Sequence, residues 1–292
     1  MTILTLIGGD GAAPALSRIA ARLAAEFAVE PLWLGAGEAC EFSLDLGDRA
    51  AVEAQARALI GRAPIDLVLQ PRAAERKKRL LVADLESTII ENEMLDELAG
   101  FLGLRAKVSA ITRRAMNGEI DFLGALEARV ALLAGMEERV LEEARARVRL
   151  MPGARTLVAT MRAAGAVTAL VSGGFAVFAE PVAAELGVDH VVANRLEIAG
   201  GRVAGRVLPP IVTGEVKRAT LFELAARHSI ALPQTLAVGD GANDLPMLAA
   251  AGLGVAFRAK PAVAAAARAR IEHADLTALL YLQGYRRGEF AA

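Results

Sequence analysis

The sequence is poor in the residues that form covalent cross-links and metal clusters. Its 292 residues include one cysteine, Cys40, and three histidines. A single cysteine excludes an internal disulfide and a cysteine-based metal centre, and it is typical of proteins from a reducing compartment. The histidines, His190, His228 and His273, have no metal-ligand spacing along the chain, so we interpret all three as structural.

Net charge, aromatic side chains and long apolar runs are also scarce. The formal net charge is -1 and aromatic residues make up 4% of the chain. Because basic residues are scattered among acidic ones, the sequence has no electrostatic footprint for nucleic acid. Residues 1–15 lack the basic start of a signal peptide, and no apolar stretch is long enough to cross a bilayer. We therefore expect a cytoplasmic protein with a small-molecule substrate and no nucleic-acid or membrane partner, and a homodimer stays open.

The chain is long enough for two structural units. Up to residue 71 the apolar pattern predicts strand, helix, strand, strand, helix and strand, and this βαββαβ order is typical of small ligand-sensing modules. Proline and charged residues at 70–79 indicate a linker, and its basic run 76–79 is expected to be a solvated tether. We predict domains at 1–75 and 76–292.

The second unit combines a parallel sheet with a block of helices. It opens with the apolar run Leu80–Ala83, which is typical of a buried strand. Helical stretches at about 91–150 follow without a strand between them, which predicts an inserted cap. Alternating helices and strands then resume, with a hairpin predicted at Arg195–Val203. The fold class predicted is α/β, a doubly wound, Rossmann-type parallel sheet with a helical cap, plus the small N-terminal βαββαβ domain.

Polar residues follow three of the predicted strands at the edge where open α/β sheets bind ligands. The strands Leu80–Ala83, Val167–Val171 and Thr235–Val238 lead into Asp84-Leu85-Glu86-Ser87-Thr88, Ser172-Gly173-Gly174 and Gly239-Asp240-Gly241-Ala242-Asn243-Asp244. Since the carboxyl ends of parallel strands share one edge, we expect these side chains to converge.

Such a group of carboxylates would repel one another without a counter-cation. A hard divalent ion, Mg²⁺ by default, removes that repulsion through oxygen ligands, and phosphate oxygens fill its open positions. Ser172 with the amides of Gly173 and Gly174, at a predicted helix N-terminus, supplies neutral donors, and Lys217 supplies a positive charge at the start of another helix. The sequence therefore predicts a magnesium site that handles phosphate.

The order of these motifs resembles the haloacid dehalogenase superfamily. Within it, Asp84–Ala99, Ala169–Phe175 and Ala237–Asp244 are similar to the phosphoserine phosphatases. The resemblance runs from about Arg79 to the C-terminus. The N-terminal order is similar to the amino-acid-binding ACT modules that precede some members.

The resemblance implies hydrolysis of O-phospho-L-serine, the last step of serine biosynthesis, with Asp84 as the nucleophile. Glu86 is implied as the general acid and then the general base. The implied metal ligands are Asp84, the main-chain carbonyl of Glu86, and Asp240, with Asp244 in support. The implied substrate-binding residues are Ser172, Gly173, Lys217 and Asn243 for the phosphate, Glu93 for the ammonium group, Arg129 for the carboxylate, and Met116 and Phe122 as an apolar lid.

One position departs from the family pattern. Most members have aspartate where this chain has Glu86, whose side chain is longer by one methylene. The phosphoserine:homoserine phosphotransferases of the superfamily are similar to this chain in having glutamate there. Two alternatives therefore stay open: transfer of the phosphoryl group to an acceptor alcohol such as homoserine, and a catalytically weakened protein that senses amino acids.

Overall fold

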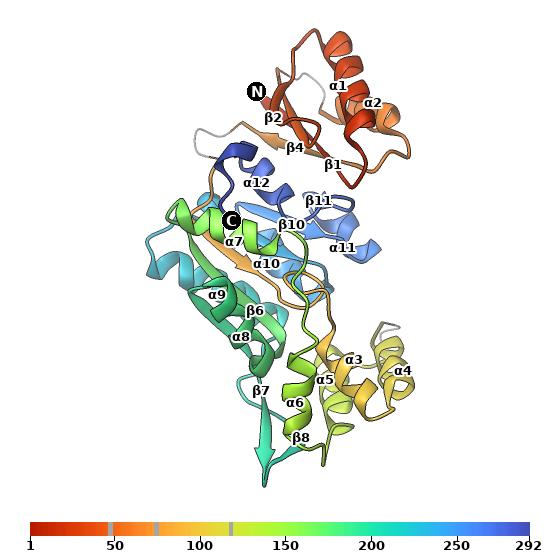
Figure 1. Cartoon of the computed structure of the whole chain (residues 1–292), viewed down its shortest axis with the longest axis vertical. Coiled ribbons are helices and arrows are strands. Elements are labelled where there is room, and N and C mark those ends of the chain that lie inside the picture. Colours follow the sequence, from red (N-terminus) through yellow and green to blue (C-terminus); the bar gives the residue numbers. More distant parts are fainter. Residues whose placement is uncertain (46–48, 73–75, 117–118) are drawn as a thin grey trace.

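The computed structural model describes residues 1–292 except 46–48, 73–75 and 117–118. Its long axis carries a small N-terminal unit at one end, a larger sheet in the middle and a helical cap at the other end (Figure 1). The smaller sheet belongs to the N-terminal unit, and the larger sheet forms the middle of the molecule.

The N-terminal unit is an antiparallel sheet covered by helices on one face. Its elements are β1 (Thr2–Gly8), α1 (Ala13–Phe27), β2 (Leu32–Gly35), β3 (Ala39–Leu44), α2 (Arg49–Ile60) and β4 (Ile65–Pro71). The strand order is β2-β3-β1-β4, and each neighbouring pair is antiparallel. Helix α1 buries Leu16, Ile19 and Leu23, a stripe at helical spacing, against Leu4 and Phe42 of the sheet. The predicted βαββαβ order is confirmed.

The larger sheet has the order β11-β10-β9-β5-β6-β7-β8. Its strands are β5 (Leu80–Ala83), β6 (Val167–Phe175), β7 (His190–Ala199), β8 (Arg202–Leu208), β9 (Thr235–Gly239), β10 (Leu253–Phe257) and β11 (Ala269–Ile271). The pairs are parallel except for β7 with β8.

Helices cover both faces of this sheet, which explains the continuous apolar sequence of β5. Leu81 packs in the core on one face, whereas Leu80 packs in the core on the other. The remaining elements are α7 (Ala154–Ala163), α8 (Ala176–Leu186), α9 (Gly214–Arg227), α10 (Leu245–Ala250), α11 (Pro261–Ala266), α12 (Ala278–Leu282), η1 (Leu232–Gln234), η2 (Ala242–Asp244) and η3 (Arg287–Glu289). The predicted doubly wound α/β fold is confirmed.

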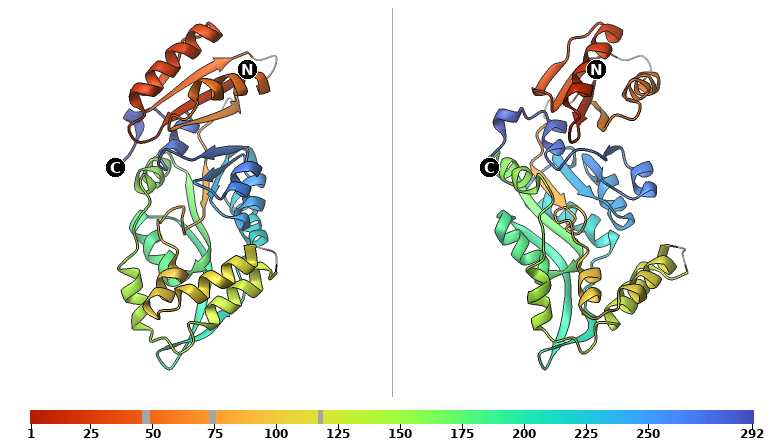
Figure 2. Two further views of the ribbon diagram at one scale, coloured as in Figure 1. Left: turned by 90° about the vertical axis from the view of Figure 1, so that its right-hand side faces the viewer. Right: turned by 45° about the vertical axis from the view of Figure 1, so that its right-hand side comes forward.

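The cap follows β5 and returns to the sheet at α7. It consists of α3 (Met94–Phe101), α4 (Arg105–Met116), α5 (Phe122–Ala131) and α6 (Arg139–Arg145), and its described part has no strand between these helices. Helix α5 packs against β8, which projects beyond the sheet with β7 (Figure 2). The hairpin is longer than the predicted Arg195–Val203, because β7 is one strand that pairs first with β6 and then with β8. Its turn does lie at Gly200-Gly201, where both φ angles are positive.

The basic run 76–79 joins the two units, so the prediction of a solvated tether is wrong. The Arg76 guanidinium contacts Oε2 of Glu41 at 2.7 Å and the carbonyl of Leu282 at 2.9 Å. Nearby, buried Asp66 of β4 accepts hydrogen bonds from the backbone amides of residues 272–274, at 2.8–3.1 Å for its shortest contacts. The domain boundary that we propose, between 75 and 76, adjoins residues 73–75, which lie outside the described part.

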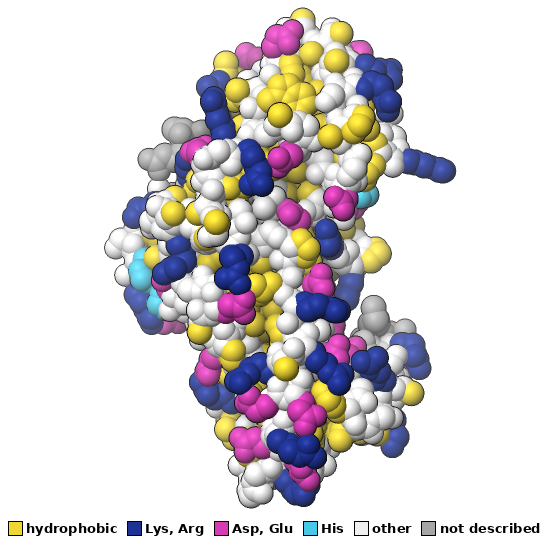
Figure 3. Space-filling view, viewed as in Figure 1, with side chains coloured by type: hydrophobic (Ala, Val, Ile, Leu, Met, Phe, Trp, Pro, Cys, Tyr) yellow, Lys and Arg dark blue, Asp and Glu magenta, His cyan; other side chains and the backbone are white. Residues whose placement is uncertain are grey.

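Basic and acidic side chains are interspersed over the visible face of the molecule (Figure 3). Among the described residues, no helix combines the length and apolar character needed to cross a membrane.

Candidate active site

Three aspartates meet at the carboxyl edge of the larger sheet. Asp84 follows β5, Asp240 follows the neighbouring strand β9, and Asp244 lies in η2. One carboxylate oxygen from each lies within 4.8 Å of the others, and all three residues are buried. Close packing depends on Gly239, because a Cβ there would collide with the Asp244 carboxyl. The predicted convergence of these strand ends is confirmed.

Lys217 supplies the positive charge at this cluster. Its helix, α9, begins after Thr213, whose hydroxyl accepts from the Val216 amide. The fully buried Nζ contacts Oδ1 of Asp84 at 2.5 Å and Oδ1 of Asp244 at 2.6 Å. Burial alone would lower the pKa of Lys217, but the two carboxylates outweigh it and raise the pKa above its ordinary value.

The aspartates differ in how far the protein already uses their oxygens. Both oxygens of Asp244 have partners, since Oδ2 also accepts from the Gly241 amide at 3.0 Å. Asp84 gives only Oδ1 to Lys217, and Asp240 has Lys260 at 3.8 Å. Asp84 and Asp240 therefore keep oxygen atoms with which to bind a divalent cation, and Asp244 is better placed to hold Lys217.

The electrostatics also fit a cation. Burial is the main cause that raises the pKa of Asp84 to about 7, against the opposing effect of Lys217. Burial likewise raises the pKa of Asp240 to about 6, and neighbouring acids add to this rise. For both carboxyl groups the nearby lysine does not offset the effect of burial, and a hard divalent ion bound by oxygen ligands would supply the missing positive charge.

Glu86 lies beside this cluster, and the fold accommodates its extra methylene. Its Oε1 accepts from the Met94 amide at 3.3 Å, at the start of α3. A Cβ on Gly174 would lie 2.6 Å from that oxygen, so the absence of a side chain at 174 leaves room for the longer acid. Burial first, and then the charges of Glu93 and Asp84, raise the pKa of Glu86 well above its ordinary value. A shift in this direction favours the protonated form, which a general acid requires.

The Ser-Gly-Gly segment differs from the expectation. It does not stand at a helix N-terminus, because β6 continues through it to Phe175 and α8 begins only at Ala176. The Gly174 amide donates to Oγ of Ser172 at 2.9 Å, so this amide is already used within the segment. Ser172 itself is buried next to the predicted site.

Asn194 of β7 holds this segment in place and was missed by sequence reasoning. Its Nδ2 donates to the Gly173 carbonyl at 2.8 Å, and its Oδ1 accepts from the Val212 amide at 2.8 Å. The side chain is 1% exposed. An asparagine directly after the apolar run Val191–Ala193 was the one signal that could have pointed to it.

Two cap segments reach this edge of the sheet. Glu93 precedes α3 and accepts from the Ser87 hydroxyl at 2.8 Å. At the start of α5, the tip of the Phe122 ring would contact a Cβ on Gly173 at 3.5 Å, and Nδ2 of Asn243 would lie 3.8 Å from the same point. Phe122 and Asn243 therefore flank Gly173.

For the other predicted cap residues, Arg129 and Met116, the described part of the structure gives no direct contact with the site. Arg129 lies seven residues after Phe122, on the same face of α5, and is half-buried. Its Nε donates to the Ala125 carbonyl at 3.1 Å, so this group bonds within the helix rather than to the carboxylates. The side chain of Met116 lies outside the described part of the structure.

Comparison with known proteins agrees with this architecture. The family model described as haloacid dehalogenase-like hydrolase matches residues 81–249. A phosphoserine phosphatase of Mycobacterium tuberculosis is 46% identical over 219 residues, which cover 75% of this chain and 54% of that protein. A phosphoserine phosphatase of Archaeoglobus fulgidus is 40% identical over 242 residues, which cover 82% of this chain and 70% of that protein. The chain thus spans little more than half of the mycobacterial relative.

The likeness to one solved structure extends over both units. The crystal structure of a HAD family hydrolase from Salmonella enterica superimposes with a TM-score of 0.85 and 30% identity, covering 97% of this chain and 98% of that one. The chain therefore belongs to the haloacid dehalogenase-like hydrolases and, within that superfamily, to the phosphoserine phosphatase family.

Proposed function

We propose that the chain hydrolyses O-phospho-L-serine to L-serine and phosphate through an aspartyl-phosphate formed on Asp84. The observation that carries the proposal is the buried Asp84 carboxyl, fixed by Lys217 at 2.5 Å and grouped with two further aspartates. The names of the relatives support the same substrate.

The cofactor in this proposal is Mg²⁺. Asp84, the main-chain carbonyl of Glu86, and Asp240 would hold it, and Asp244 would support them through Lys217. When bound, the ion neutralises charge on the carboxylates and on the phosphate oxygens. Side chains of the protein carry out the nucleophilic attack and the proton transfers.

The first half-reaction transfers the phosphoryl group to the protein. Lys217 holds Oδ1 of Asp84, and with the cation bound through the same oxygen, Oδ2 would stay free to attack phosphorus. A bond forms between that oxygen and phosphorus while the bond from phosphorus to the seryl oxygen breaks. Glu86, whose raised pKa favours the protonated form, gives its proton to the seryl oxygen, and serine leaves as the alcohol.

The second half-reaction returns Asp84 to its starting state. Glu86, now a carboxylate, takes a proton from water, and the water oxygen attacks phosphorus. The bond between phosphorus and Asp84 breaks, which releases inorganic phosphate and leaves Glu86 protonated again. The cycle balances without any further reactant.

Substrate binding divides between the sheet edge and the cap. Ser172, Gly173, Lys217 and Asn243 would contact the phosphate, while the exposed Glu93 would face the ammonium group. Arg129 would bind the carboxylate as a planar fork. The position of Phe122 next to Gly173 supports this arrangement, because it brings the arginine-bearing face of α5 toward the Ser-Gly-Gly segment.

A panel of phosphate esters tests the proposal. Phosphate release is measured for phosphoserine, phosphothreonine and sugar phosphates with Mg²⁺, with EDTA, and with Asp84→Asn. We expect phosphoserine to be the best substrate, and both EDTA and the substitution to abolish turnover. Faster turnover of sugar phosphates would contradict the substrate, and an active Asp84→Asn variant would contradict the nucleophile.

Glu86 favours one second candidate, phosphoryl transfer to an acceptor alcohol. Adding homoserine to the same assay and measuring phosphohomoserine distinguishes transferase from phosphatase. The third option, a weakened protein that senses amino acids, requires that phosphoserine bind without phosphate release. We further propose a cytoplasmic location, and equilibrium sedimentation would decide between monomer and homodimer.

A further inference from the structure

Two of the three histidines meet far from the carboxylate cluster. His190 is the first residue of β7, and His228 caps the C-terminus of α9. Their Nε2 atoms lie 3.1 Å apart, with ring centroids separated by 5.2 Å and ring planes inclined by 59°. The residues are 38 positions apart in sequence, so ligand spacing along the chain could not reveal the pair.

The separation of the two nitrogens matches that of two ligands bound to one metal ion. Nitrogen ligands lie about 2.0–2.1 Å from zinc, which places two of them about 3.3 Å apart at a tetrahedral angle and about 2.9 Å apart at a right angle. The observed 3.1 Å falls between these values. A direct hydrogen bond between two neutral rings has a similar length. The rings therefore take the same positions whether a metal ion or a shared proton lies between the two nitrogens.

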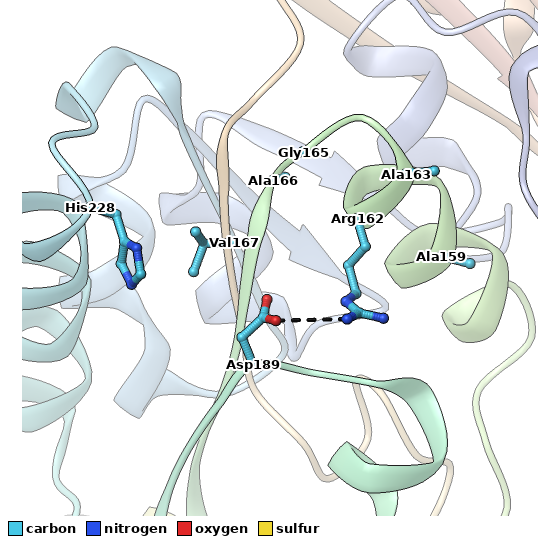
Figure 4. A pocket seen from close by; sticks show the side chains of 8 residues that line it. All are labelled: Ala159, Arg162, Ala163, Gly165, Ala166, Val167, Asp189 and His228. Atoms are coloured by element: carbon cyan, nitrogen blue, oxygen red, sulfur yellow. Dashed lines mark ion pairs between the residues drawn. The ribbon is translucent and has the colours of Figure 1, made fainter.

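The surroundings leave room for further ligands. His228 lines a pocket of about 590 Å³ whose wall is formed by α7 and the residues that lead into β6 (Figure 4). Arg162 and Asp189 lie on the same pocket and pair with each other at 3.8 Å. Asp189 is also tied to Thr168, through the backbone amide and the hydroxyl at 2.9 Å each. Water or a small anion could therefore complete the coordination without displacing these protein contacts.

The pair lies at the opposite edge of the sheet from the catalytic cluster. The pocket adjoins Val167 at the start of β6, whereas Ser172 marks the catalytic edge of the same strand. His190 itself pairs with Ala169, three residues before Ser172, which corresponds to about 10 Å along the strand. An ion at the histidines would thus be independent of the ion at the aspartates, and it would be of a different kind, because imidazole favours zinc, copper and nickel over magnesium.

We propose that His190 and His228 form a binding site for a divalent transition-metal ion of the class that prefers imidazole, with Nε2 of each ring as a ligand. Water or a small anion fills the remaining positions from the pocket side. This site does not depend on the substrate of the catalytic centre.

The test measures Cu²⁺ and Zn²⁺ binding to the full chain in excess Mg²⁺, which saturates the carboxylate cluster. The variants are His190→Gln and His228→Gln, and the matched control is His273→Gln, an exposed histidine beside Gly9 at the junction of the two units. We expect one equivalent of Cu²⁺ or Zn²⁺ to bind wild type and the control equally. Each test variant should lose at least tenfold in affinity.

Electron paramagnetic resonance of the Cu²⁺ complex provides a second readout. Wild type should show coupling to two imidazole nitrogens, and each test variant should show one or none. Circular dichroism and Mg²⁺-dependent phosphate release confirm that the variants are folded. Absence of stoichiometric binding, equal affinity in wild type and both test variants, or a spectrum without imidazole coupling would each overturn the site in favour of a simple hydrogen-bonded pair.

Discussion

The ammonium group of Lys217 lies 2.5 Å from Oδ1 of Asp84, and the lysine side chain has no exposed surface. A charge buried to this degree is tolerated only when opposite charges and hydrogen bonds replace water. Asp84 and Asp244 both provide them. The arrangement fixes the orientation of Asp84, the proposed nucleophile, and it also makes the two aspartates dependent on the lysine.

Lys217→Met should therefore destabilise the protein strongly. Removing one partner of a buried ion pair leaves uncompensated charge, and we expect the free energy of unfolding in EDTA to fall by about 3–5 kcal/mol. Urea titration followed by circular dichroism measures it. The matched control is Lys260→Met, because Lys260 is exposed and lies 3.8 Å from Asp240, where an ion pair contributes less than about 1 kcal/mol. Equal losses in the two variants would contradict the role given to Lys217.

Gly174→Ala should impair catalysis through Glu86. A Cβ at this position would lie 2.6 Å from Oε1 and 2.9 Å from Cδ of Glu86, so the acid must move. A displacement of about 1 Å at a reacting group can lower the rate about 10²-fold, and we expect kcat for phosphoserine to fall by that order.

The matched double variant makes this explanation specific. Combining Gly174→Ala with Glu86→Asp shortens the acid by one methylene, which should restore part of the lost kcat. Gly288→Ala serves as the control, because a Cβ there has no neighbour within 4 Å among the described residues. An unchanged kcat in Gly174→Ala, or no recovery in the double variant, would show that the glycine does not make room for Glu86.

Metal binding should depend on pH. The pKa of Asp84 is raised to about 7 and that of Asp240 to about 6, with burial as the largest cause in each case. Since a cation binds the deprotonated carboxylates, affinity for Mg²⁺ should rise from about pH 6 to about pH 8, by up to about tenfold per unit for each proton released. Calorimetry in buffers of different ionisation enthalpy measures those protons. Asp240→Asn should reduce their number, and binding independent of pH would contradict the assignment of these ligands.

The raised pKa values also determine whether the metal-free protein gains or loses stability as pH rises. A carboxyl whose pKa is raised on folding binds protons more tightly in the folded state, so its contribution is fully present below the unfolded pKa, about 3.8. That contribution is lost as pH rises toward the folded value of about 7. The metal-free protein should therefore lose stability over this interval, and Mg²⁺ should reverse the loss at its upper end.

The strand ends were predictable because their positions follow from topology. Asp84 and Asp240 each follow a short apolar run, and parallel strands bring such residues to one edge whatever the details of packing. The helical cap was predictable for a similar reason, since helical periodicity without an intervening strand excludes it from the sheet. Both inferences use information that is local in sequence.

Contacts that depend on distant parts of the chain could not be predicted. Arg76 looked like part of a solvated run, but its partners Glu41 and Leu282 lie 35 and 206 positions away. The amides of Gly173 and Gly174 were expected at a helix N-terminus, because the apolar pattern does not show that pairing with β7 extends to Phe175. Local periodicity carries no information about such partners.

Asn194 offers a test of whether the Ser-Gly-Gly segment, residues 172–174, needs a fixed position. Asn194→Asp keeps the acceptor for the Val212 amide but replaces the donor to the Gly173 carbonyl by an oxygen, so two acceptors face each other. We expect the free energy of unfolding to fall by about 1–3 kcal/mol and kcat/KM for phosphoserine to fall about 10- to 100-fold, with Mg²⁺ affinity nearly unchanged.

Gln283→Glu separates positioning from general destabilisation. Gln283 is also 1% exposed and bridges two backbone groups, accepting from the Lys78 amide and donating to the Leu279 carbonyl at 2.9 Å each, but it lies at the junction with the N-terminal unit. Its substitution removes an equivalent donor and should lower stability by a similar amount. Because no residue of the proposed site contacts Gln283 through these bonds, kcat/KM at a temperature where both variants are folded should stay close to wild type. If the two variants lose activity equally, Asn194 acts only through stability, whereas a loss confined to Asn194→Asp identifies it as the residue that holds Gly173 against the phosphate.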